Sequence, residues 1–186
     1  MQNVWLRPIT LEDAGSVQRY ASDERLAATC NVPHPYPSNG GQQFAERSVR
    51  AREQRQRFPH AIICDGQFVG VIGINLPDFA NLTAEVDYWL AVSFWSRGIM
   101  TQAVGLVAGV AFQELNFRYL FSGCWAENPA SCRVLEKNGF REIESVINDG
   151  HFGQKFLGQT IRRFRLSYED WFNRANFSYQ VDETDE

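Results

Sequence analysis

Two acidic side chains, Glu85 and Asp87, stand two positions apart in the aromatic and β-branched segment Ala84–Val92. Side chains two apart on a strand point to the same side, so both carboxylates face one space if this segment is extended. A carboxylate can take a proton from an incoming ammonium group, directly or through water, and a pair can hold a cationic substrate. Glu85 is therefore the first candidate for a general base and Asp87 the second; the alternative is an ordinary solvent-facing strand position.

A candidate anion site follows at Ser96, Arg97 and Gly98, between a strand expected to end near Val92 and a helix expected to begin near Ile99. The first turn of a helix presents unpaired backbone N–H groups and the positive end of the helix dipole. Glycine lets phosphate oxygens approach the backbone, and the arginine adds a positive charge. The sequence has no GxGxxG and no GxxxxGK[ST], so neither a dinucleotide-binding fold nor a P-loop is indicated.

The elements that must position these groups begin with a strand at Val4–Pro8 and a helix opened by a capping box of Thr10 and Asp13. Three prolines make Asn31–Pro37 an ordered loop or a lid. Gln42–Arg57 is a polar helix with five arginines and two glutamates, and its net charge of +3 marks either a solvated face or a surface that steers an anionic ligand.

The rest of the chain alternates strand and helix signals. The turn Asp65-Gly66 joins two apolar runs, Ala61–Cys64 and Phe68–Asn75, into a hairpin. Glycines, prolines and the spacing of apolar residues then predict a strand, a helix, a strand, a helix and two strands. These are Ala84–Val92, Ile99–Leu115, Tyr119–Trp125, Pro129–Asn138, Phe140–Ile147 and Gln154–Leu166, which together indicate a mixed α/β protein.

The segment Asn128–Phe140 resembles the signature N-x-x-S-x-R-V-L-E-K-x-G-F of the GNAT acetyltransferases, especially their RimJ/RimL-like branch. Trp5–Asp13 is similar to the first strand and helix of that branch, and Trp95–Met100 to its acetyl-CoA pyrophosphate loop. The resemblance covers residues 4–172. It implies an α+β GNAT fold: a mixed, mostly antiparallel seven-stranded sheet, splayed between strands 4 and 5 and flanked by about four helices.

The same resemblance implies an N-acetyltransferase that uses acetyl-CoA as co-substrate, needs no metal and moves the acetyl group to a primary amine by direct attack in a ternary complex. Trp95, Ser96 and Met100 depart from the usual loop pattern, and Asp87 stands where the branch often has glycine. The residues implied to bind acetyl-CoA are Leu90, Ala91, Val92, Arg97, Gly98, Ile99, Met100, Thr101, Asn128 and Ser131.

Asn128 and Ser131 each have two explanations. Asn128 can bond to the pantetheine arm, as the matching family residue does, or cap the helix that begins at Pro129. Ser131 can donate a proton to the departing thiolate, or it is a second cap or a packing residue. Two histidines, His34 and His151, are lesser candidates for the base.

Composition limits the function classes. The 186 residues carry a net charge of −4, and the acids of Asp182–Glu186 account for all of it. A neutral body argues against non-specific nucleic-acid binding. The longest weakly polar run, Ile99–Phe112, falls short of the roughly 20 residues that span a membrane. Four cysteines without a CxxC or a metal-ligand spacing indicate a reduced, cytoplasmic protein with no covalent acyl-cysteine.

We therefore expect one acetyltransferase domain over residues 1–177 and an acidic, disordered tail over residues 178–186. The acceptor is a small-molecule amine or a protein N-terminus, and the neutral body slightly favours the small molecule. Aromatic residues in the last hairpin make a homodimer plausible. The alternatives are a CoA-binding sensor or scaffold without catalysis, and an interaction domain with an empty cleft.

Overall fold

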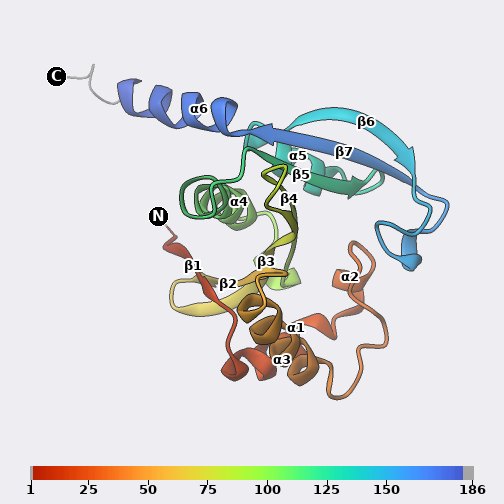
Figure 1. Cartoon of the computed structure of the whole chain (residues 1–186). Helices are drawn as coiled ribbons and strands as arrows, with labels where there is room; N and C mark the ends of the chain where they lie inside the picture. Colours follow the sequence, from red (N-terminus) through yellow and green to blue (C-terminus); the bar gives the residue numbers. More distant parts are fainter. Residues whose placement is uncertain (1, 182–186) are drawn as a thin grey trace.

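The computed structural model describes residues 2–181, and for residues 175–181 only the course of the backbone. One seven-stranded sheet has the order β1-β2-β3-β4-β5-β7-β6, with β4 and β5 parallel and the other neighbouring pairs antiparallel (Figure 1). The strands are β1 (Val4–Pro8), β2 (Phe58–Cys64), β3 (Gln67–Asp78), β4 (Thr83–Leu90), β5 (Tyr119–Trp125), β6 (Arg141–Ile147) and β7 (Thr160–Ser167). The expected GNAT sheet is confirmed.

Helices cover both faces of this sheet. They are α1 (Ala14–Ala21), α2 (Glu24–Ala27), α3 (Gly40–Glu53), α4 (Ile99–Gly109), α5 (Pro129–Lys137) and α6 (Tyr168–Val181). Within the described residues there are thus six α-helices where about four were expected, and α2 and α6 are the two that were not predicted. No helix in this part of the chain is both long and apolar enough to cross a membrane.

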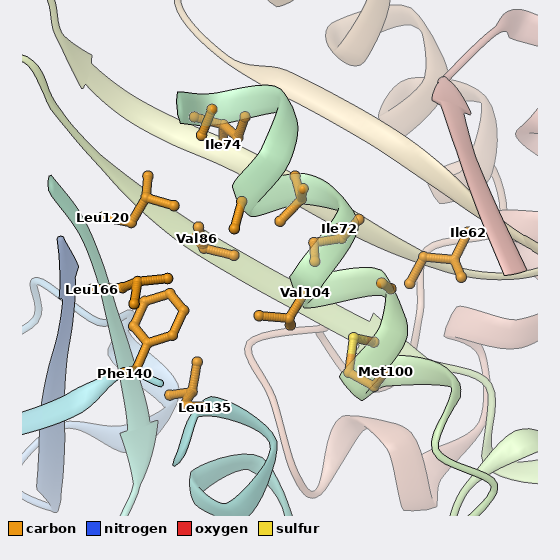
Figure 2. Packing of buried hydrophobic residues seen from close by; sticks show 14 of the residues in the cluster. Ile62, Ile72, Ile74, Val86, Met100, Val104, Leu120, Leu135, Phe140 and Leu166 are labelled. Carbon is orange, nitrogen blue, oxygen red and sulfur yellow. The ribbon is translucent and has the colours of Figure 1, made fainter. Parts of the chain in front are cut away.

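The core lies mainly between the sheet and α4 (Figure 2). Met100 and Val104 of α4 point at Ile72 of β3 and Val86 of β4 in that view. A second cluster, which includes Val17 and Ala45, packs α1 and α3 against the opposite face. Because side chains alternate along a strand, β4 sends Val86 and Leu90 to the α4 side.

Two local signals in the sequence are confirmed. Thr10 and Asp13 form the expected capping box, and Asp13 also makes an ion pair with Arg7, 2.6 Å between Nη2 and Oδ1. Burial acts to raise the pKa of Asp13, but the hydrogen bonds from Arg7 and Thr10 outweigh it and hold that pKa below its usual value. Asp65 and Gly66 both adopt positive φ in the turn between β2 and β3.

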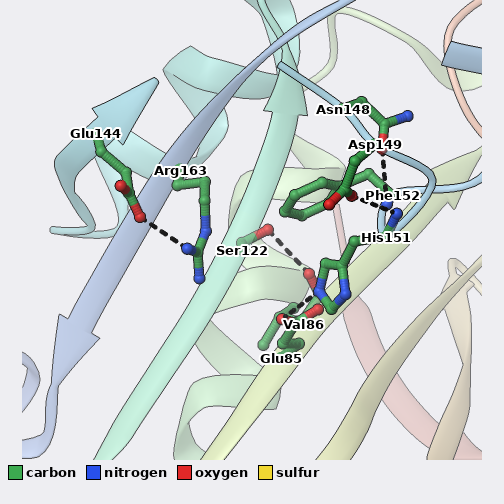
Figure 3. Close-up of polar contacts among 9 residues, drawn as sticks. All are labelled: Glu85, Val86, Ser122, Glu144, Asn148, Asp149, His151, Phe152 and Arg163. Carbon is green, nitrogen blue, oxygen red and sulfur yellow. Dashed lines mark hydrogen bonds and ion pairs between the residues drawn. The ribbon is translucent and has the colours of Figure 1, made fainter. Parts of the chain in front are cut away.

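The parallel strands β4 and β5 pair over a short stretch. Thr83, Ala84 and Glu85 of β4 face Tyr119, Leu120 and Phe121 of β5, and the register ends there. One residue further on, the Ser122 hydroxyl donates to the Val86 carbonyl over 2.8 Å (Figure 3). Beyond this bond the two strands diverge, which leaves one edge of each without a strand partner.

Several boundaries differ from expectation. The helix after Gly98 ends as α-helix at Gly109 and continues as a π turn to Glu114. The last strand begins only at Thr160, since residues 148–159 form a loop with a single 3₁₀ turn. α6 runs to Val181, and residues 182–186, most of the expected tail, lie outside the described residues.

Candidate active site

A cavity of about 1130 Å³ opens where β4 and β5 separate. Its walls come from both halves of the molecule. On one side lie the loop between α2 and α3, one face of α3, and parts of β3 and β4; on the other lie β5, α5 and the loop between β6 and β7. The turn before α4 closes one end. The divergence of two parallel strands therefore opens a large recess between the two halves of the molecule.

The anion corner, residues Trp95–Thr101, lies at that end of the cavity. Gly98 has φ +76° at the N-cap of α4, and no side chain caps the helix there. A Cβ added at Gly98 would meet no other atom within 4 Å, so the space before the first helical N–H groups is open. This geometry suits a phosphate group, as the sequence predicted.

Three cations from the turn and from α5 line the cavity that includes this corner. Arg97 belongs to the turn, and Arg133 and Lys137 stand one helical turn apart on α5 and line the same cavity. Within the described residues none of the three has an ion pair with an acidic side chain. Sequence reasoning missed Arg133 and Lys137, although their spacing of four inside the motif segment was an available signal.

Not every residue implied to bind acetyl-CoA lines the cavity. Ala91 and Val92 lie outside its lining, and Ala91 donates its N–H to Val69 and accepts from the N–H of Phe94. The Leu90 carbonyl accepts from the indole of Trp95 over 2.7 Å. The structure does bring together Leu90, Arg97, Gly98, Ile99, Met100, Thr101, Asn128 and Ser131 in the cavity wall.

Asn128 and Ser131 sit where α5 begins. The Asn128 side chain accepts from the backbone N–H of Ser131 over 3.2 Å, so it caps the helix. Its Nδ2 donates to the Thr29 carbonyl, 3.2 Å away, on the opposite side of the cavity. Asn128 thus caps α5, and it also lines the cavity.

Ser131 has a partner that the sequence did not predict. The hydroxyl oxygens of Tyr88 and Ser131 are 2.9 Å apart, which joins β4 to α5. Burial raises the pKa of Tyr88 to about 12, and the bond to Ser131 offsets part of that shift. Tyr88 therefore stays protonated at ordinary pH and can donate to the serine, which leaves the serine hydrogen free to point into the cavity.

The two candidate carboxylates have different surroundings. Asp87 lines the cavity opposite Gly73, where a Cβ would come within 2.8 Å of Asp87 Oδ1. Arg57 Nη2 lies 3.2 Å from Asp87 Oδ2, and Arg57 Nε donates to the side chain of Asn75. The side chain of Asp87 is 61% exposed although protein surrounds it on several sides. Partial desolvation raises its pKa, against the opposing effect of Arg57.

Glu85 does not line the cavity. Its carboxylate lies 3.3 Å from Nε2 of His151, in the loop between β6 and β7 (Figure 3). Asn148, which is 1% exposed, orders this loop by accepting from the N–H groups of Gly150 and Phe152. The structure thus brings together two candidates for the base, Glu85 and His151, and places them beside the cavity.

The other sequence candidates lie elsewhere or differ from expectation. His34 is not part of the cavity wall. Cys124 of β5, which lines the cavity, forms a disulfide with Cys132 of α5, with 6.1 Å between their Cα atoms. The expectation of four reduced cysteines was wrong for this pair, because the spacing in sequence did not reveal that β5 and α5 place them side by side.

The comparisons with known proteins agree with this geometry. A family model described as an acetyltransferase (GNAT) domain matches residues 3–141. The probable N-acetyltransferase YjcK of Bacillus subtilis (strain 168) is 33% identical over 148 residues, which make up 76% of this chain and 82% of that protein.

Two further comparisons concern ribosomal-protein acetyltransferases. The ribosomal-protein-serine acetyltransferase of Escherichia coli (strain K12) is 34% identical over 91 residues, 49% of this chain, and the match spans about half (50%) of that protein. The structure of RimL, a ribosomal L7/L12 alpha-N-protein acetyltransferase, in complex with coenzyme A superposes with a TM-score of 0.81. At 17% identity over 90% of this chain and 95% of that one, this similarity concerns the fold.

Proposed function

The chain belongs to the GNAT acetyltransferase family, and from this premise we propose that it transfers an acetyl group from acetyl-CoA to a primary amine, with both substrates bound at once. One observation carries the proposal. A single cavity joins an open anion corner, two unpaired strand edges and a carboxylate that can take a proton.

The residues in this cavity fit acetyl-CoA. The N–H groups at the start of α4, with Arg97, Arg133 and Lys137, would hold its phosphate groups. The edges of β4 and β5 beyond Glu85 would pair with the amides of its pantetheine arm, since no strand occupies them. When bound, acetyl-CoA supplies a thioester whose acetyl carbon is open to attack by a neutral amine.

Asp87 and Ser131 would move the protons. Asp87 lines the cavity and its raised pKa makes it a better proton acceptor for an ammonium group than an ordinary aspartate. Ser131, held by Tyr88, would donate to the sulfur of the leaving group. Glu85, the first choice from the sequence, would act only through His151 or water, because it stands outside the cavity wall.

Acetyl-CoA binding by calorimetry and thiol release with a panel of amines test the function together. We expect both binding and turnover. Binding without turnover on a broad panel would instead support a CoA-binding sensor or scaffold, and absence of both would end the proposal.

A matched pair of variants tests the choice of base. Asp87→Asn should lower kcat by roughly 10²-fold and remove the rise of rate with pH, because the amide cannot take a proton. Glu85→Gln should retain most of the rate. A large loss of rate in Glu85→Gln together with a small loss in Asp87→Asn would instead identify Glu85 as the general base. A homodimer and a cytoplasmic location stay predictions, to be tested by size-exclusion chromatography and cell fractionation.

A further inference from the structure

α3 presents a stripe of polar side chains without acids to the cavity. Gln43, Arg47, Arg50 and Gln54 follow one another at helical spacing, and all four line the cavity. The acids of the same helix, Glu46 and Glu53, are not part of the cavity wall. Two of the three arginines of α3 are therefore turned toward the cavity, while Arg52 donates to the Pro59 carbonyl of β2.

The two arginines of this stripe have no acidic partner. Within the described residues neither Arg47 nor Arg50 has an ion pair or a side-chain hydrogen bond, whereas Arg57 is bound to Asn75 and Asp87. Burial raises the pKa of Tyr36 in the cavity wall, and the charge of Arg47 opposes that shift. The positive charge of Arg47 therefore acts on a side chain of the cavity wall.

These arginines lie apart from the anion corner. α3 packs against one face of the sheet and α4 against the other. Figure 1 shows α3 below β2 and β3 and α4 above these two strands. The phosphate groups of CoA would be held by Arg97, Arg133 and Lys137, which belong to the turn before α4 and to α5.

The cavity wall as a whole is cationic. Its ionised side chains are those of Arg47, Arg50, Arg57, Arg97, Arg133 and Lys137 against the single carboxylate of Asp87, which is itself paired with Arg57. A polyamine would be repelled by the arginines of α3, and the single carboxylate available to it, Asp87, is already paired with Arg57. A molecule with a carboxylate or phosphate would give Arg47 and Arg50 the partner that the protein does not supply.

We propose that the acceptor amine carries an anionic group, a carboxylate or a phosphate, which Arg47 and Arg50 bind. This inference rests on the proposed acetyl transfer to an amine. It reverses the preference for a cationic amine that Glu85 and Asp87 suggested from the sequence. The amine itself would lie toward Asp87 and the anionic group toward α3.

The test uses pairs of acceptors that differ in one anionic group. The carboxylate arm compares the peptide amides Ser-Glu-Ala and Ser-Gln-Ala, the phosphate arm compares O-phosphoethanolamine with ethanolamine, and spermidine is the cationic reference. In at least one arm the anionic member should have a kcat/KM at least 10-fold higher, mainly through KM, and added salt should reduce the advantage.

Variants of Arg47 and Arg50 test whether these two residues cause the preference for anionic acceptors. Arg47→Gln with Arg50→Gln should bring the ratio within each pair close to one and leave the Kd for acetyl-CoA unchanged. Arg19→Gln on α1 removes one arginine charge outside the cavity wall and should leave the ratio as in the wild type. Equal or better use of the neutral and cationic amines, or a ratio that survives the double variant, would overturn the inference.

Failure of the proposed function gives a different pattern. If no amine is acetylated although acetyl-CoA binds, the transferase assignment is wrong, while the anionic acceptors can still be tested by calorimetry in the presence of CoA. Tighter binding of the anionic members, lost in the double variant, supports the assignment of Arg47 and Arg50. Equal binding within each pair rejects it.

Discussion

The hydroxyl groups of Tyr88 and Ser131 act on each other across two elements of the fold. Tyr88 lies on β4 and Ser131 on the first turn of α5, with 2.9 Å between their oxygens. A serine hydroxyl without such a partner rotates freely, whereas here the hydrogen bond with the tyrosine restricts it. We regard Tyr88 as a positioning residue that orients the serine hydroxyl.

This pairing can be tested by a double-mutant cycle. Tyr88→Phe and Ser131→Ala should each lower kcat by roughly 10-fold with little change in the KM for acetyl-CoA, since each removes one part of a single unit. The double variant should lose little more than either alone. Fully additive losses, or normal kcat in Tyr88→Phe, would contradict the pairing. Phenylalanine keeps the ring that packs against the core, so folding should be retained.

A buried histidine that is not part of the cavity wall predicts how stability depends on pH. His60 is 5% exposed, and its pKa is lowered to about 4 by burial and by Arg52, with an opposing contribution from the Phe58 backbone. Between about pH 4 and pH 6.5 the unfolded chain binds a proton here that the folded chain does not. Stability should therefore fall as the pH drops through this range, by about 3 kcal/mol at most.

Thermal unfolding at pH 5 and pH 7.5 measures this effect. His60→Gln should show a smaller difference in Tm between the two pH values than the wild type, because the glutamine does not titrate. His34→Gln, outside the core, is the matched control and should keep the wild-type difference. An unchanged difference in His60→Gln would assign the acid sensitivity to other groups.

For single residues, the sequence identified the candidates for the general base but not which of them lines the cavity. Spacing placed Glu85 and Asp87 on one side of a strand, but the point at which β5 leaves β4 decides which of them lines the cavity. That point depends on contacts between distant segments. Tyr88 was missed for the same reason, since its partner stands 43 residues away.

Among the elements, the turn before α4 carries the clearest local requirement. Gly98 has positive φ and nothing in front of it, so a side chain there is strained without any clash. Gly66, in the turn between β2 and β3, has the same two properties and is not part of the cavity wall. The two glycines therefore form a matched pair.

Alanine at each position separates strain from binding. Gly98→Ala and Gly66→Ala should both lower stability by about 1 kcal/mol, because positive φ disfavours a Cβ. Only Gly98→Ala should also weaken acetyl-CoA binding, by several-fold in calorimetric Kd. Equal affinity in the two variants would show that this corner does not hold the phosphate groups.

Most elements followed from local signals, and the exceptions have physical causes. Val4–Pro8 and Tyr119–Trp125 were predicted to the residue, since alternation and turn signals bound them. The four-residue α2 is too short for a periodic pattern. α6 was missed although two signals were available: the acids Glu169 and Asp170 in its first turn, and Tyr168, Trp171 and Phe172 at helical spacing.

At the scale of the whole molecule, the cavity is bounded by two kinds of contact between the halves of the sheet. At one end, β4 and β5 pair through three residues of each strand. At the other, Lys155 in the loop between β6 and β7 donates to the carbonyls of Ala27, Cys30 and Val32. The long loop after β6 thus fastens the proline-rich segment over the cavity.

Loss of this fastening should affect ligand release. Lys155→Met removes the donor and keeps much of the side-chain volume, so the loop should open more often and CoA should dissociate several-fold faster. Stopped-flow displacement of CoA measures this rate, with Arg19→Gln as the control for a surface charge change. An unchanged dissociation rate would show that CoA leaves by another route.

The placement of α3 and α4 on opposite faces of one sheet has a consequence for divergence within the family. Under the two proposals above, the acyl donor would be recognised mainly by the turn before α4 and by α5, and the acceptor by α3, with β4 common to both. Replacing side chains on α3 should then redirect the enzyme to another amine while donor affinity is preserved. Such modularity would let many specificities arise from one inherited scaffold.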